Sequence, residues 1–168
     1  MTTTAQERNA QAARQARVGQ GARAEQTAAA FLRGRSLRLL ARNYRAPGGE
    51  IDLIAEEAGT LVFVEVRLRS GTRHGGALES IDRPKRRRIV LAARHYLAQR
   101  RGAEPPCRFD VVLLMPVRTG RAGCVTSESR DRDQGNTVNE THPMGGLNSR
   151  EEGYAIEWLR DAFSADDC

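Results

Sequence analysis

Gly49-Glu50-Ile51-Asp52-Leu53-Ile54-Ala55 and Phe63-Val64-Glu65-Val66-Arg67 are the two stretches of sequence that decide the fold. Both have the composition of buried β-strands, because Ile, Leu, Val and Phe dominate them. Each also contains acids, and a carboxylate among apolar side chains is costly unless a cation or a hydrogen-bond donor offsets its charge. Acids that converge from neighbouring strands are typical ligands of a divalent cation, so the two stretches predict a metal site on a sheet.

Short turns join these strands to each other and to a strand before them. Pro47-Gly48-Gly49 separates residues 37–45 from residues 50–57, and Ala58-Gly59-Thr60 separates the latter from residues 61–69. Turns this short connect antiparallel neighbours. The sequence therefore predicts a three-stranded antiparallel meander.

A helix is predicted on each side of this meander. Apolar residues at three-to-four spacing indicate one over residues 21–35, and Asp82 with Pro84 favours the start of another that ends near Arg101. Residues 108–117 then contain a nearly continuous apolar run, typical of a strand that is buried on both faces. Because a crossover helix precedes it, this strand is predicted to be parallel to the third strand of the meander.

The C-terminal part of the chain changes character. Residues 119–153 are rich in Gly, Ser, Asn, Asp, Arg and Glu and poor in large apolar side chains, so we expect a disordered insertion. Residues 154–158 alternate in polarity and predict a short last strand, and residues 159–163 predict a terminal helical turn. The fold class is thus α/β, a mixed sheet of about five strands flanked by helices. It forms one domain over residues 18–163, between short tails at residues 1–17 and 164–168.

Charge is distributed unevenly along the 168 residues. Residues 1–114 carry 21 Lys and Arg against 11 Asp and Glu, whereas residues 115–168 carry 6 against 10. The basic part is the part with the carboxylates, which favours nucleic acid as a partner over an anionic membrane. The alternative is a basic surface with no partner.

Nothing in the sequence indicates a membrane span or a disulfide framework. No apolar run approaches the roughly 20 residues that cross a bilayer. The three cysteines are scattered and odd in number: Cys107, Cys124 and Cys168. A cytoplasmic protein with no membrane partner is the expectation.

The acids of the meander are expected to share one point in space. Side chains two apart on a strand share a face, so Glu50 and Asp52 point the same way. A turn centred near Gly59 sets Asp52 opposite Glu65 or Val66. Oxygen ligands of this kind suit Mg²⁺ or Mn²⁺, with Asp52, Glu65 and Glu50 as the candidate metal ligands.

Metal-assisted phosphodiester hydrolysis needs a polarised phosphate, an activated water and a cation near the developing charge. Asp52 and Glu65 can serve the first two needs through the metal ion, Arg67 can serve the third, and Glu25 on the first helix can add a carboxylate. The alternative is that the acids face solvent and that Glu65 and Arg67 form an exposed ion pair of little energetic value.

The densest basic run lies at the start of the second helix. Its residues can present cations and free N–H groups to a phosphate backbone, although positive charge at a helix N-terminus is unfavourable for the helix dipole. The candidate nucleic-acid-binding residues are Arg45, Arg83, Lys85, Arg86, Arg87 and Arg88. The alternative is a solvated helix face.

Together these motifs resemble the bacterial YraN-like family. The matching residues are Gly21-x-x-x-Glu25-x-x-Ala28, Arg42-Asn43-x-Arg45, Gly49 to Ala55, Phe63 to Arg67, Arg108-Phe109-Asp110-Val111-Val112 and Ile156-Glu157-Trp158-Leu159-x-x-Ala162-Phe163. The resemblance implies a restriction-endonuclease-like fold similar to archaeal Holliday junction resolvases. It also implies a nuclease pattern of acid, acid and acid-x-lysine on Glu25, Asp52, Glu65 and Arg67.

Arg67 departs from that nuclease pattern, which has lysine. Arginine can hold a phosphate with two donors, but it cannot give up its proton near neutral pH. The leading hypothesis is a Mg²⁺- or Mn²⁺-dependent endonuclease acting on DNA, at branched or damaged sites. The alternatives are a non-catalytic nucleic-acid-binding protein on a nuclease fold and an interaction module that uses the acidic C-terminal part. A resolvase-like enzyme is compatible with a homodimer, although no residue identifies an interface.

Overall fold

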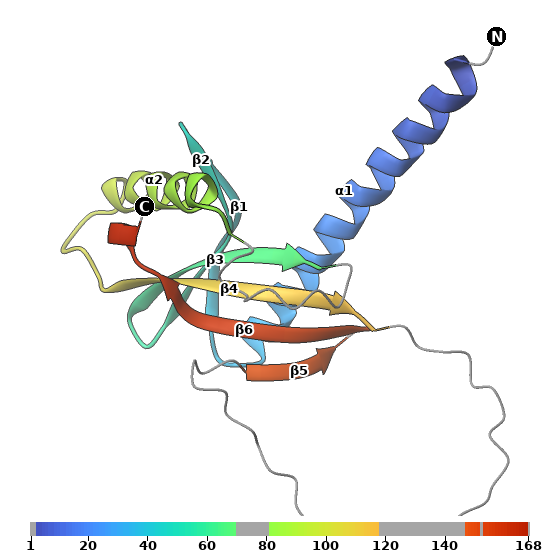
Figure 1. Ribbon diagram of the computed structural model, residues 1–168. Coiled ribbons are helices and arrows are strands. Elements are labelled where there is room, and N and C mark those ends of the chain that lie inside the picture. Colours follow the sequence, from blue (N-terminus) through green and yellow to red (C-terminus); the bar gives the residue numbers. More distant parts are fainter. Residues whose placement is uncertain (1–2, 70–80, 118–146, 152, 168) are drawn as a thin grey trace, which may run out of the picture.

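The computed structural model of the chain describes residues 3–69, 81–117, 147–151 and 153–167. These ranges contain both predicted helices and all the predicted strands (Figure 1). Residues 119–146 of the predicted insertion lie outside them, so disorder there stays a prediction, whereas residues 147–151 of the insertion form a strand. Within the described ranges, no helix is long and apolar enough to cross a membrane.

The first three strands form the predicted meander. They are β1 (Arg38–Ala46), β2 (Gly49–Glu57) and β3 (Thr60–Leu68), and both neighbouring pairs are antiparallel. The turns that join them contain Gly48 and Gly59, whose φ angles of 86° and 84° lie in the left-handed region that glycine adopts without strain. The turn residues thus fix the order and direction of these strands.

The next two elements form the predicted crossover. Helix α2 (Arg83–Ala98) begins where the Asp82 carboxylate accepts a hydrogen bond of 2.9 Å from the backbone N–H of Lys85. Strand β4 (Cys107–Pro116) then pairs with β3 in parallel, which confirms the predicted direction. Strand β4 therefore occupies the interior of the sheet.

The C-terminal part differs from the prediction in two ways. Strand β6 (Tyr154–Phe163) covers residues 159–163, so the helical turn predicted there is wrong; a short 3-10 helix, Ala165–Asp167, follows instead. An additional strand, β5 (Leu147–Glu151), pairs with β6 and makes the sheet six-stranded, in the order β1-β2-β3-β4-β6-β5. Strand β6 continues as far as Phe163. The ring of Phe163 stacks on the ring of Phe109 in β4, with 5.0 Å between centroids, and this contact holds the end of the strand on the sheet.

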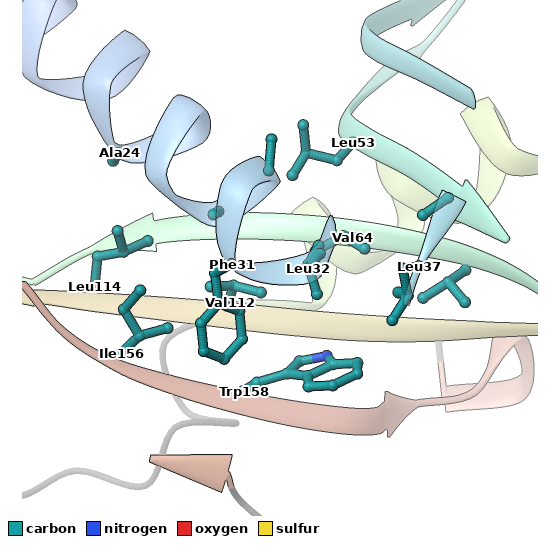
Figure 2. Packing of buried hydrophobic residues seen from close by; sticks show 14 residues of the cluster. Ala24, Phe31, Leu32, Leu37, Leu53, Val64, Val112, Leu114, Ile156 and Trp158 are labelled. Carbon is teal, nitrogen blue, oxygen red and sulfur yellow. The ribbon is translucent and has the colours of Figure 1, made fainter. Parts of the chain in front are cut away.

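Two apolar clusters attach the helices to opposite faces of the sheet. Helix α1 (Thr3–Arg33) packs on the face that carries Val64, and its Phe31 ring meets the Trp158 ring edge-on with 6.1 Å between centroids (Figure 2). The neighbouring side chain Phe63 points to the other face, where α2 packs. The period-two alternation of β3 thus separates an α1 layer from an α2 layer.

Helix α1 begins much earlier than the predicted start near Gly21. Residues 3–17, which we expected to be a flexible tail, frayed or weakly helical, are helical and extend away from the sheet (Figure 1). The first buried apolar side chain of the helix is Ala24. Alanine and arginine have high helix propensity, which explains a helix that continues beyond the residues it buries. The flexibility of these residues stays a prediction.

Candidate functional site

Asp52 and Glu65 face each other across the pair of β2 and β3. Leu53 pairs with Val64 in the ladder, and the backbone N–H of Val66 donates a hydrogen bond of 2.8 Å to Asp52 Oδ2. Asp52 therefore lies opposite the peptide that joins Glu65 to Val66. This is the register that the short turn at Gly59 predicted.

Glu65 is the buried acid of the site. Its side chain is 3% exposed, and its Oε2 atom is buried. Burial raises the pKa of Glu65 to about 7, and the negative charge of Asp52 acts in the same direction. The exposed ion pair considered as an alternative is therefore wrong for Glu65.

Two cations approach Glu65 from different elements. Arg67, two residues further along β3, places Nη1 3.8 Å from Glu65 Oε1. Lys85, in the first turn of α2, places Nζ 3.2 Å from Glu65 Oε2, and its own side chain is only 15% exposed. The sequence assigned Lys85 to the basic run alone, because the contact joins segments that are separated by residues 70–80. The site thus contains an ammonium group although Arg67 replaces the lysine of the nuclease pattern.

Glu50 lies at the outer edge of the site. Its side chain is 56% exposed, and its Oε1 atom is 3.8 Å from Lys85 Nζ. Lys85 therefore contacts both the buried and the exposed acid. The role of Glu50 as a direct metal ligand stays a prediction, since its carboxylate is linked to the Asp52 and Glu65 pair through Lys85.

Glu25 belongs to the α1 layer of the molecule. The helix buries Ala24 and Ala28 on the face of the sheet opposite α2, whereas Lys85 reaches Glu65 from α2. Among the described residues, no group of three or more His, Cys, Asp or Glu side chains has the arrangement of a metal site. The participation of Glu25 in the site stays a prediction.

The basic run divides into exposed side chains and one that the fold uses internally. Arg83, Arg87 and Arg88 are exposed on α2. Arg86 instead donates a hydrogen bond of 3.0 Å from Nε to the carbonyl oxygen of Ile81, and its guanidinium lies over the Phe163 ring at 5.7 Å from the centroid. Arg86 is therefore less available to a phosphate backbone than its position in the run suggested.

An open hollow of about 620 Å³ adjoins the carboxylates. It lies between the β1–β2 turn and α2, and its lining residues are Arg45, Ala46, Gly48, Gly49, Glu50, Lys85 and Arg88. Gly49 permits this close approach, because a Cβ atom there would lie 1.9 Å from the backbone oxygen of Arg88. Two predicted nucleic-acid-binding residues, Arg45 and Arg88, thus meet Lys85 in one cationic recess beside the acids.

Residues 24–114 of this chain match the uncharacterised protein family UPF0102. The match includes the acids and both cations of the site. The chain belongs to the UPF0102 family, which confirms the YraN-like resemblance of its motifs. Its α/β sheet with helices on both faces is compatible with the nuclease-like fold that the resemblance implies.

Two bacterial relatives match over most of their own length. A UPF0102 protein of Nitrosomonas europaea is 44% identical over 143 residues, which cover 85% of this chain and 92% of the relative. A UPF0102 protein of Cupriavidus taiwanensis is 58% identical over 103 residues, which cover 61% of this chain and 78% of the relative. The similarity therefore extends over most of each relative.

Proposed function

We propose that this protein is a Mg²⁺- or Mn²⁺-dependent endonuclease that hydrolyses DNA phosphodiester bonds, at branched or damaged sites. The observation that carries the proposal is the pairing of Asp52 with a buried Glu65 whose pKa is raised to about 7, beside Lys85 and Arg67. A buried carboxylate beside a second, half-buried one is costly to hold in its charged form, and a carboxyl group with a raised pKa of this kind is typical of functional sites.

The oxygen atoms of the site fit a hard divalent cation. Glu65 Oε2 is buried beside the Lys85 ammonium, which lies 3.2 Å away, and Asp52 has a second oxygen besides the one that Val66 contacts. Asp52 and Glu65 would hold the metal ion, with Glu50 nearby. When bound, such an ion polarises the scissile phosphate and activates the attacking water.

The protein's own cations have separate tasks in this proposal. Arg67 steadies the scissile phosphate, because its side chain is 36% exposed and its guanidinium lies 3.8 Å from Glu65. Lys85 contacts Glu65 and Glu50, and its ammonium can donate to a phosphate oxygen that enters the recess. Lys85 thus supplies the ammonium group that the nuclease pattern has at the position of Arg67.

Several features support DNA as the substrate. The region that contains the site is strongly basic, and Arg45 and Arg88 line the recess beside it. The choice of DNA over RNA, and of branched over linear DNA, rests on the family resemblance. A cytoplasmic location and a homodimer remain parts of the same proposal.

Cleavage of labelled linear, nicked, flapped and four-way-junction DNA tests the activity. The wild type is compared with Asp52→Asn and Glu65→Gln in Mg²⁺, Mn²⁺ or EDTA, and Glu104→Gln serves as a control because Glu104 is an exposed acid outside the site. We expect metal-dependent cutting that both site variants lose and that the control retains. Cutting that survives in EDTA, or in both site variants, would contradict the assignment.

A second function is favoured by the same ion pairs. Lys85 and Arg67 already neutralise much of the charge of Glu65, so the acids can act as supports for a cationic binding surface. A non-catalytic nucleic-acid-binding protein would bind DNA or RNA in EDTA, with an affinity that falls as salt rises. Tight binding without cutting of any substrate would select this function over the endonuclease.

A further inference from the structure

Strand β1 is an edge of the sheet. Among the described strands it pairs with β2 alone, so its outward N–H groups face away from the sheet. Three of its side chains are exposed arginines: Arg38, Arg42 and Arg45. An edge that combines backbone donors with cations is suited to an anion.

A second open hollow lies along this edge, away from the recess beside the acids. Its volume is about 550 Å³, and it is lined by Arg33 at the end of α1 and by residues 37–42. Arg38 is paired with Glu56 at 2.7 Å, whereas no acid is among the described residues that line the hollow. Arg33 and Arg42 therefore dominate its charge.

The two hollows occupy opposite ends of one strand. The recess with Arg45 and Arg88 lies at the C-terminal end of β1, and the hollow with Arg33 and Arg42 lies towards its N-terminal end. At about 3.3 Å per residue, the strand spans roughly 25 Å from Arg38 to Ala46. This length corresponds to roughly seven or eight base pairs of duplex, each of which advances about 3.4 Å.

The geometry of the edge opposes the addition of another strand. The register of β1 shifts between Leu39 and Ala41, and Asn43 has a φ angle of 49° in the left-handed region. Both features interrupt the regular row of backbone groups that a peptide strand, or a second copy of β1, needs for pairing. A polyanion that is held through its charges does not require such a row.

We infer that the β1 edge binds the phosphate backbone of nucleic acid and extends the contact from the candidate active site towards α1. The inference rests on the nucleic-acid substrate of the proposed function, but it does not require cleavage. It adds Arg33 and Arg42 to the binding residues. It also predicts that the protein distinguishes substrates by length, because a duplex much shorter than about seven base pairs does not reach both hollows.

Fluorescence anisotropy with the full chain tests this binding edge in EDTA. Labelled hairpins with a stem of about 4 base pairs and labelled duplexes of about 20 base pairs are titrated against wild type, the Arg33→Gln/Arg42→Gln double variant and an Arg100→Gln/Arg101→Gln control, which removes equal charge from exposed residues beyond α2. We expect the Arg33→Gln/Arg42→Gln variant to bind the long duplex about tenfold more weakly than wild type. The slope of log affinity against log salt concentration should become shallower by about two. Binding of the short hairpin, and the control, should change little.

Each result has a distinct meaning. Equal losses in the double variant and the control, or equal losses on the hairpin and the long duplex, would overturn the inference. The edge would instead belong to a protein partner if a labelled glutamate-rich peptide bound wild type but not the double variant, while both proteins bound the long duplex equally. Length-dependent DNA binding without cutting would keep the edge and reject the nuclease, whereas cutting with affinity indifferent to Arg33 and Arg42 would reject the edge alone.

Discussion

The surroundings of Glu65 disfavour the ionised form of its carboxyl group and raise its pKa to about 7. Desolvation and the neighbouring Asp52 both disfavour its negative charge, and Lys85 with Arg67 only partly restores it. The folded protein therefore binds a proton at Glu65 more tightly than the unfolded chain does. For a carboxyl group with a raised pKa, the free energy of unfolding falls as pH rises from the ordinary value of 4.5 towards 7.

A neutral residue at position 65 abolishes the decrease in the free energy of unfolding that ionisation of Glu65 causes. We expect Glu65→Gln to stabilise the metal-free protein relative to wild type, and the gain should be roughly 2 kcal/mol larger at pH 8 than at pH 5.5. Urea unfolding at both pH values in EDTA measures the difference. A gain that does not depend on pH would show that the buried charge is not its cause, and Glu104→Gln should change neither value.

Lys85 is the residue whose role the sequence could not show. It is the only lysine of the chain. Lys85→Met should lower the cleavage rate about a hundredfold, because it removes the ammonium group that contacts Glu50 and Glu65 and that would donate to a substrate phosphate. Lys85→Arg retains the charge and should have an intermediate rate with nearly unchanged DNA affinity. Equal losses of rate and affinity in both variants would assign Lys85 to binding alone.

The acids and the lysine of the site differ in how far sequence could predict them. Asp52 and Glu65 lie on strands joined by a short turn, so local register alone brings them together. Lys85 meets Glu65 only because α2 packs over the sheet, and no local pattern encodes that contact. For Arg86 the sequence overestimated the exposure of the side chain. Its position in the basic run suggested a solvent-exposed cation, but its contacts with the carbonyl oxygen of Ile81 and with the Phe163 ring leave it half-buried.

At the scale of elements, Asp110 joins β4 to the end of β6. Its buried carboxylate accepts hydrogen bonds from Trp158 Nε1 at 3.0 Å and from the backbone N–H of Asp161 at 2.9 Å. Arg108 Nε donates to the same group at 3.0 Å, and its Nη2 atom is 2.8 Å from Glu57. This network fixes β6 where its pairing with β4 shifts register near Phe109.

Breaking this network should loosen β6 strongly. We expect Asp110→Asn to destabilise the protein by about 3 kcal/mol, because the amide removes one of the two charged partners of Arg108 and turns its own N–H groups towards the donors that Asp110 accepts from. Chemical unfolding monitored by the fluorescence of Trp158 reports this loss. Asp161→Asn is the matched control, since that side chain is exposed and asparagine tolerates its φ of 48°. A loss below about 1 kcal/mol would contradict a structural role for Asp110.

The elements themselves were predicted where local chemistry determines them. Turn glycines and apolar runs identified the meander, the crossover helix and the parallel β4. Strand β5 was missed because its sequence, Leu147-Asn148-Ser149-Arg150-Glu151, is mostly polar and its pairing with β6 is tertiary. The end of β6 was assigned to a helical turn because a few residues cannot distinguish the two periods without their partners in β4.

For the molecule as a whole, function and folding are separated along the chain. Asp52, Glu65, Lys85 and the two cationic hollows lie within residues 33–88, on the α2 side of the sheet and along its β1 edge. The end of α1 supports the hollow with Arg33, whereas the first part of the same helix extends away from the sheet (Figure 1). The boundary between these two parts of α1 is therefore also the N-terminal boundary of the folded domain.

Truncation of α1 locates that boundary. Removal of residues 1–17 should change the free energy of unfolding by no more than about 0.5 kcal/mol, because the buried residues of the helix begin at Ala24. Removal of residues 1–28 should cause extensive unfolding, since it also deletes Ala24, Thr27 and Ala28 from the cluster beneath α1. Thermal melts of the two truncations measure the contrast. A large loss of stability from the shorter truncation would show that the projecting part of α1 has a packing partner, such as a second copy of the chain, and the dependence of the melt on protein concentration would then identify it.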